Sequence, residues 1–142
     1  MLRLPRDLYL QMVAHCIAGL PEEACGLFAG DPMSGSIDRL YPTRNAAASA
    51  RVYTVDSRDL LQADRDAERN GTQLIGVFHS HTHTDAYPSS TDVEQAPDPG
   101  WHYALVSLRD SHPVLRSYRI DGPVIEEESV VVLGQAAVAL AV

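Results

Sequence analysis

Three histidines, His79, His81 and His83, lie within five residues and follow the apolar run at residues 74–78. If this run is an extended strand, the side chains of His79 and His81 point to the same side and can reach one ion. Asp92 follows eleven residues after His81, where serine and threonine residues predict the start of a helix. Two imidazoles and one carboxylate match a catalytic zinc site, whose fourth position is left to water. The pattern predicts one zinc ion per chain.

Hydrolysis at such a site also needs a carboxylate that does not bind the metal, because a proton must pass from water to the leaving group. Glu22 and Glu23 are the candidates, since both stand directly before the apolar segment 25–28. The sequence contains neither H-E-x-x-H nor C-x-x-C, which excludes the best-known helical zinc peptidase motif and a four-thiolate structural site.

The elements that must position these residues can be predicted from periodicity and breakers. Helical spacing or capping signals predict helices over residues 6–18 and 57–69, the latter capped by Asp56 or Ser57, and a short helix that starts near Ser89 and ends before Pro97. Apolar runs predict strands over residues 25–29, 37–43, 52–55, 74–78, 101–108, 114–120 and 124–133. This order is not a regular βαβ alternation and predicts an α/β protein of the α+β type, with a mixed sheet flanked by helices.

Length and composition indicate one domain, residues 1–142, with its core at about 5–133 and an apolar tail at 134–142. The tail is either a loosely packed end, or a cover over the core or a dimer contact. The net charge is −8 and all 11 basic residues are arginine, so we expect no nucleic acid and no membrane partner. Two cysteines and no apolar signal segment predict a reducing, cytoplasmic location.

Three separated motifs together resemble the signature of the JAMM (MPN-plus) zinc metalloproteases. They are the segment E-A-C-G-L at 23–27, G-V-F-H-S-H at 76–81 and P-S-S-T-D at 88–92. The order, the spacings and the predicted elements agree over about residues 5–130. One position departs from the pattern, since many relatives have proline where this chain has Thr82. The resemblance implies the MPN fold, a cytidine-deaminase-like sandwich.

The resemblance also implies roles for individual residues. Glu23, rather than Glu22, stands at the general acid/base, and His79, His81 and Asp92 stand at the zinc ligands. Ser89 stands where a hydroxyl stabilises the tetrahedral oxyanion, and Ser80 stands where it can hold the ligand loop by hydrogen bonds.

Further segments resemble small bacterial Mec-type members of the family, among them P-E-E-A-C-G at 21–26 and H-Y-A-L-V-S at 102–107. This implies a ubiquitin-like β-grasp sulfur-carrier protein as substrate, cut after its C-terminal Gly-Gly to release cysteine or a peptide. Two alternatives remain at this point. One is a general isopeptidase for other tags, similar to deubiquitinases, and the other is a non-catalytic MPN scaffold that only binds partners. The oligomeric state is open, with a dimer as one possibility.

The remaining polar and sulfur-containing residues receive plainer interpretations. Cys16 and Cys25 are expected in the core, and His102 is expected to be an ordinary strand histidine. His83 is expected to be a solvated loop residue, and the run at 126–128 is expected to be a solvated edge.

Overall fold

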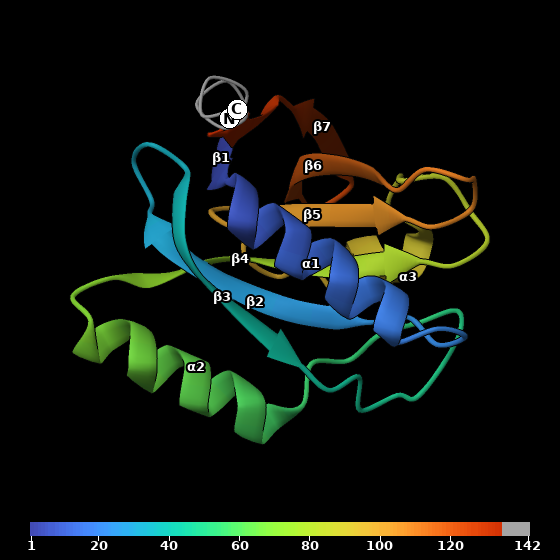
Figure 1. Cartoon of the computed structure of the whole chain (residues 1–142), viewed down its shortest axis with the longest axis horizontal. Helices are drawn as coiled ribbons and strands as arrows, with labels where there is room; N and C mark the ends of the chain where they lie inside the picture. Colours follow the sequence, from blue (N-terminus) through green and yellow to red (C-terminus); the bar gives the residue numbers. More distant parts are fainter. Residues whose placement is uncertain (135–142) are drawn as a thin grey trace, which may run out of the picture.

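An eight-stranded mixed sheet forms the centre of the molecule in the computed structural model, which describes residues 1–134 (Figure 1). The strands are β1 (Leu2–Pro5), β2 (Cys25–Asp31), β3 (Ser36–Thr43), β4 (Gln73–His81), β5 (His102–Ser107), β6 (Val114–Asp121), β7 (Val124–Glu128) and β8 (Val130–Leu133). The helices are α1 (Arg6–Ala18), α2 (Ser57–Arg69) and α3 (Ser90–Glu94). The strand order is β7-β6-β5-β4-β2-β3-β1-β8, so β4 lies inside the sheet between β2 and β5.

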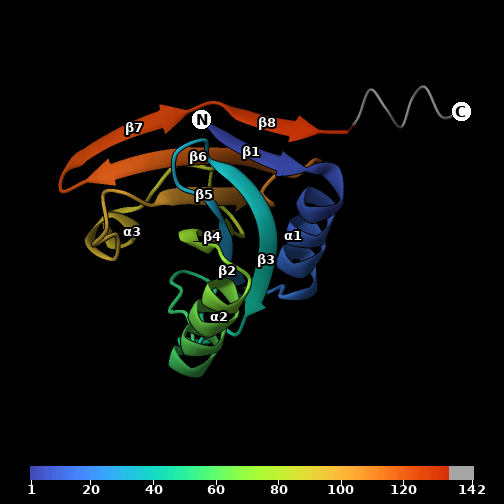
Figure 2. The ribbon, with the colours of Figure 1, turned by 90° about the vertical axis from the view of Figure 1, so that its left-hand side faces the viewer.

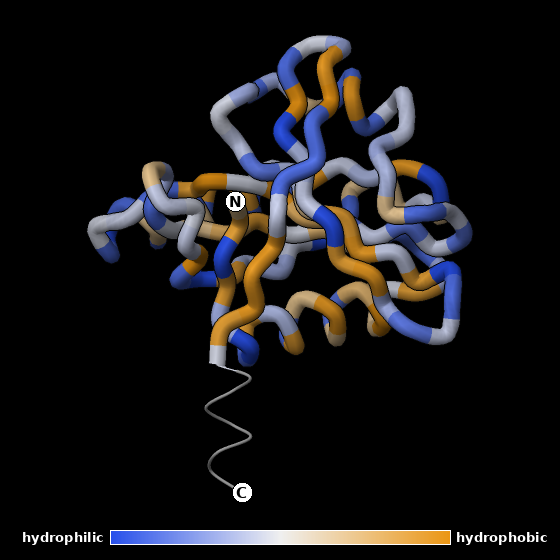
Figure 3. The backbone as a smooth tube through the Cα atoms, turned by 90° about the horizontal axis from the view of Figure 1, so that it is seen from above, coloured by the Kyte–Doolittle hydropathy of each residue, from blue (hydrophilic) through white to orange (hydrophobic). Residues whose placement is uncertain are grey.

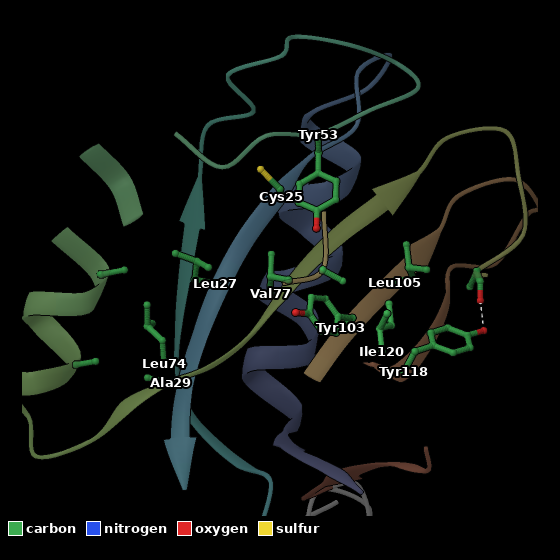
Figure 4. Close-up of a cluster of buried hydrophobic side chains, with 14 residues drawn as sticks. Cys25, Leu27, Ala29, Tyr53, Leu74, Val77, Tyr103, Leu105, Tyr118 and Ile120 are labelled. Atoms are coloured by element: carbon green, nitrogen blue, oxygen red, sulfur yellow. Dashed lines mark hydrogen bonds between the residues drawn. The ribbon is translucent and has the colours of Figure 1, made fainter. Parts of the chain in front are cut away.

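Helices α1 and α2 cover opposite faces of this sheet, and each face has its own core (Figure 2). Successive residues of a strand alternate between the faces. Leu27 and Val77 accordingly pack on the α2 side, with the aromatic and aliphatic residues drawn in Figure 4, whereas Phe28 and Phe78 pack on the α1 side. Hydrophobic stretches follow the strands and hydrophilic ones largely follow the connecting loops (Figure 3).

Two glycines let the central strands β2 and β4 accommodate large rings. Gly26 pairs with Phe78 and Gly76 pairs with Phe28 in the antiparallel ladder. A Cβ atom built on either glycine would lie 2.3 Å from a ring carbon of the opposing phenylalanine. Any larger residue would therefore overpack the α1 side of the sheet.

The helices confirm the sequence-based predictions closely. Helix α1 starts after Pro5, α2 is capped by the side chain of Asp56, and α3 is capped by Ser89. The predicted strand at residues 52–55 is wrong, because this segment forms only an isolated bridge between Asn45 and Val55. The side chain of Asn45 bonds to the backbone of Val52 and Thr54, which occupies polar groups that a sheet neighbour would need.

The C-terminal strand region and the N-terminus also differ from the prediction. The expected strand 124–133 is two strands, since β7 pairs with β6 and β8 pairs with β1, with Ser129 between them. Strand β1 was not predicted, because four residues ending in proline give too short an alternation. Leu2 and Leu4 of β1 are fully buried, so the core begins before residue 5. Of the apolar tail, residues 135–142 lie outside the described part of the chain.

The interpretation of residues 126–128 as a solvated edge is wrong for Glu128. Its side chain is only 7% exposed and lies 2.6 Å from Nδ1 of His102 and 2.8 Å from the Met1 amine. Ser117 donates a further hydrogen bond of 2.8 Å. Burial alone would raise the pKa of Glu128, but these partners lower it to about 2.

The helices of the described residues include none that is long and apolar enough to cross a membrane.

We predict that Glu128→Gln lowers the free energy of unfolding at pH 7 by about 1.5–3 kcal/mol, because charged hydrogen bonds are lost. The folded-state pKa lies below the ordinary value, so this stabilisation is present above pH 5 and disappears as the pH falls toward 2. Urea unfolding at pH 7 and pH 3 measures the difference from the unaltered protein. The exposed Glu127→Gln is the control, and an equal loss in both variants would contradict the assignment.

Candidate metal centre

The end of β4 and the start of α3 bring His79, His81 and Asp92 together, as the spacing predicted. One ligand atom from each residue lies within 4.8 Å of the others. Oδ2 of Asp92 is 3.2 Å from Nε2 of His79 and 2.9 Å from Nε2 of His81. The three side chains are almost fully buried, with exposures of 3–5%. Such a converging set of two imidazoles and a carboxylate matches the donors of a catalytic metal site.

The two imidazoles are prepared to bind a cation. Nε2 of His79 is buried and has no hydrogen-bond partner among the described residues, although Asp92 lies near it. Burial lowers the pKa of His79, which favours the neutral ring that metals bind. Nδ1 of His81 lies 2.8 Å from the carbonyl oxygen of Asp85. A carbonyl only accepts, so Nδ1 carries the hydrogen and leaves the lone pair on Nε2. The residues present therefore fit a metal ion.

Glu23, in the segment before β2, lies in a cavity next to His81. Glu23, His81 and Ser89 line one cavity of about 610 Å³. The Glu23 side chain is 4% exposed, and its Oε1 has no hydrogen-bond partner among the described residues. Burial raises the pKa of Glu23 to about 7, and the charges of His81 and Asp92 act on it in opposite directions. Glu22 is exposed and does not line this cavity, so the structure separates the two acids.

Ser89 and Asp92 form a capping box at the start of α3. The hydroxyl of Ser89 accepts a hydrogen bond of 3.1 Å from the Asp92 amide, and the Ser89 amide donates to Oδ2 of Asp92 at 2.9 Å. The capping box thus orients the carboxylate toward the two imidazoles. As the hydroxyl only accepts in this contact, its own hydrogen remains available for a donor role.

Ser80 points to the opposite face from the two histidines and ties β4 to the segment that carries Glu23. Its hydroxyl accepts from the Ala24 amide at 2.9 Å, and its own amide donates to the Ala24 carbonyl at 2.9 Å. The predicted hydrogen-bonding role of Ser80 is present in the structure. Asn45 adds a second tie, because its side-chain amide donates to the Glu23 carbonyl at 2.9 Å.

Tyr53 is a site neighbour that the sequence analysis missed. Its ring stacks on that of His79 with a centroid separation of 4.0 Å and an interplanar angle of 18°. Tyr53 is 5% exposed and comes from the loop between β3 and α2. The segment V-Y-T-V at 52–55 was instead assigned to the sheet, and no local signal placed its aromatic ring against a histidine.

The other singled-out residues lie as expected or nearby. Cys16 and Cys25 are fully buried, and the Cys25 thiol lies 3.4 Å from the hydroxyl of Thr43. His83 is exposed, as expected, but it lines the cavity that Glu23 also lines. His102 contacts Glu128, away from the three ligand candidates.

Comparison with known proteins decides the family. The family described as prokaryotic homologs of the JAB domain matches residues 5–121. The chain belongs to this family. It is 47% identical over 123 residues to a protein named CysO-cysteine peptidase from Mycobacterium tuberculosis, covering 85% of this chain and 84% of that protein. It is 33% identical over 111 residues to a desampylase from Haloferax volcanii, covering 75% and 80%.

The fold agrees with a solved relative as well. The solution structure of a protein from Desulfitobacterium hafniense has a TM-score of 0.87 and 34% identity, covering 95% of this chain and 94% of that one. The resemblance to the JAMM family and the predicted α+β fold are therefore confirmed. This JAB family member is a JAMM-type hydrolase.

We predict that His81→Ala loses the metal, because two remaining ligands do not hold a zinc ion tightly. The measurement is zinc content per chain after incubation with zinc and dialysis. His83→Ala is the matched control and should keep about one zinc per chain. Full loading of the His81→Ala protein would show that the ligand assignment is wrong.

Proposed function

We propose that this JAB family member is a zinc peptidase that cleaves a ubiquitin-like β-grasp sulfur carrier after its C-terminal Gly-Gly, in the cytoplasm. The observation that carries the proposal is the convergence of His79, His81 and Asp92 beside the cavity that Glu23 and Ser89 line. The relative at 47% identity is named for a CysO–cysteine substrate, which supports a carrier joined to a small leaving group.

The three ligand candidates would hold the zinc ion, and the ion would polarise the scissile carbonyl and lower the pKa of the attacking water. His81 stays oriented through its bond to the Asp85 carbonyl, and Asp92 stays oriented through the capping box. The burial of all three side chains keeps competing water away from the reacting atoms.

Glu23 and Ser89 would carry the proton and the developing charge. A carboxylate whose pKa is raised to about 7 can take a proton from water and return it to the departing amine near neutral pH. The free hydrogen of the Ser89 hydroxyl can be donated to the oxyanion, while the lone pairs continue to cap α3.

An apolar cavity next to the site suits the end of a carrier protein. It has a volume of about 650 Å³, and its wall is formed by Leu27, Val55, Leu60 and Trp101 together with Tyr53. Tyr53 also stacks on His79, so the cavity adjoins the ligand cluster. Apolar side chains before the Gly-Gly pair would bury surface in this cavity, and the glycines themselves have no side chain to collide with the Tyr53 ring.

The same cavity offers an unpaired stretch of extended backbone. In the segment before α2, the carbonyl of Thr54 accepts a hydrogen bond from the Ala46 amide, and the Asp56 amide donates one to the Arg44 carbonyl. The amide and carbonyl groups of Tyr53 and Val55, which alternate with these, have no hydrogen-bond partner among the described residues. An extended tail could add to this edge as a strand, which supports a substrate with an unstructured C-terminus.

We predict that Glu23→Gln keeps the zinc and lowers kcat by about 10²–10⁴-fold, because an amide cannot take the proton of the attacking water. Steady-state kinetics and zinc content measure the two effects separately. Glu22→Gln is the matched control and should retain activity. An equal loss in the two variants would mean that the wrong acid carries the proton.

We further predict that the enzyme removes cysteine from a carrier–cysteine adduct only when it is loaded with zinc. Mass spectrometry of the folded carrier before and after incubation detects the loss of one cysteine residue, and a chelated sample is the control. If the adduct stays intact while lysine-linked conjugates are cleaved efficiently, the carrier–cysteine substrate is wrong and the protein is an isopeptidase.

The second candidate function is that of an isopeptidase for conjugates of ubiquitin-like proteins. It is favoured by the 34% identity to a Thermus thermophilus protein named as a probable TtuB-protein conjugate cleaving protease, over 67% of this chain. The non-catalytic scaffold has no such support, because all of the expected ligand and acid positions are present and converge.

A further inference from the structure

The cavity that contains Glu23 differs in chemistry from the apolar cavity beside Tyr53. Its wall includes Arg51, His83 and the hydroxyl-bearing residues Thr82 and Thr84. The apolar cavity has no basic residue in its wall. If the carrier tail occupies the apolar cavity, as proposed above, the group on the other side of the scissile bond enters the polar one.

The backbone of Arg51 is held in place relative to Glu23 and the end of β4. Its amide donates to the Ser49 hydroxyl at 3.0 Å, and the Ser49 carbonyl accepts from the Glu23 amide at 2.8 Å. On the other side, the carbonyl of Ala50 accepts a hydrogen bond of 3.2 Å from Thr82, the residue after His81. The backbone of Arg51 is therefore tied both to the proposed proton carrier and to the end of the ligand strand.

The guanidinium of Arg51 lacks a carboxylate partner among the described residues. Arg69 and Arg116, which also line cavities, are each paired with an acid, at 3.4 Å and 2.9 Å respectively. In a protein with a net charge of −8, an unpaired guanidinium in the cleft that contains Glu23 is a distinct positive group. It would bind an anion that the protein itself does not supply, and a carboxylate fits the fork of a guanidinium.

We propose that Arg51 binds the α-carboxylate of the leaving group, so that the enzyme selects carriers joined to a single free amino acid. This inference rests on the proposed function. In such an adduct the carboxylate carbon is two bonds from the scissile nitrogen, whereas a lysine-linked conjugate has only methylene groups near that nitrogen. Hydrolysis adds water across the C–N bond and passes a proton to the amine, and the carboxylate stays ionised and bound throughout.

The test compares two folded carrier adducts that differ in one group. One ends in cysteine with its free carboxylate, and the other ends in cysteinamide, which has the same shape without the charge. We expect the unaltered enzyme to prefer the acid by about tenfold or more in kcat/KM, the scale of a charge-assisted hydrogen bond. Arg51→Gln should remove this preference by slowing cleavage of the acid and leaving cleavage of the amide unchanged.

Arg65→Gln is the matched control, since Arg65 is exposed on α2 and lines neither cavity at the site. Equal rates on both adducts with the unaltered enzyme would overturn the role of Arg51 while the proposed function stands. An equal slowing of both adducts in Arg51→Gln would also overturn it, because the arginine would then be structural. If the unaltered enzyme cleaves neither adduct, the proposed function itself fails.

Discussion

Burying a carboxylate costs free energy unless hydrogen-bond donors or cations surround it. The arrangement of the site depends on how this requirement is met for the buried carboxylate of Asp92. Its Oδ2 lies within 3.2 Å of two imidazole nitrogens and accepts a hydrogen bond of 2.9 Å from the Ser89 amide. These partners come from the end of β4 and the start of α3. The two histidines reach the carboxylate because β4 stays extended to its last residue, paired with β2 as far as His79 and with β5 as far as His81.

The proposed reaction centre thus depends on a strand and a helix, whereas the walls of the two cavities beside it depend partly on a loop. The segment between β3 and α2 contributes Tyr53 to the apolar cavity and Arg51 to the polar one. It has little sheet structure of its own, and the side chain of Asn45 satisfies much of its backbone. Selectivity for the proposed substrate's tail and leaving group can therefore change through loop residues while the proposed metal ligands remain where β4 and α3 place them.

The parts of the molecule that could be predicted from sequence are those fixed by short-range rules. The alternation of a strand places His79 and His81 together, and a capping signal places Asp92 in the first turn of a helix. The stacking of Tyr53, the burial of Glu128 and the separation of β7 from β8 depend on partners far away in the chain. The sequence alone indicates that a run of three acids is exposed to solvent. The burial of Glu128, the last of them, follows only from its contacts with His102 and Ser117.

The reciprocal pair of hydrogen bonds between Ser80 and Ala24 has a consequence for the timing of the chemistry. Ser80 stands between His79 and His81, the proposed metal ligands, and Ala24 is the immediate neighbour of Glu23. The proposed metal ligands and the proposed proton carrier are therefore joined directly by backbone and side-chain hydrogen bonds between their neighbours in the chain. Their relative translational and rotational freedom is removed when the chain folds, before any substrate arrives, so that little entropy remains to be lost at the moment of bond breaking.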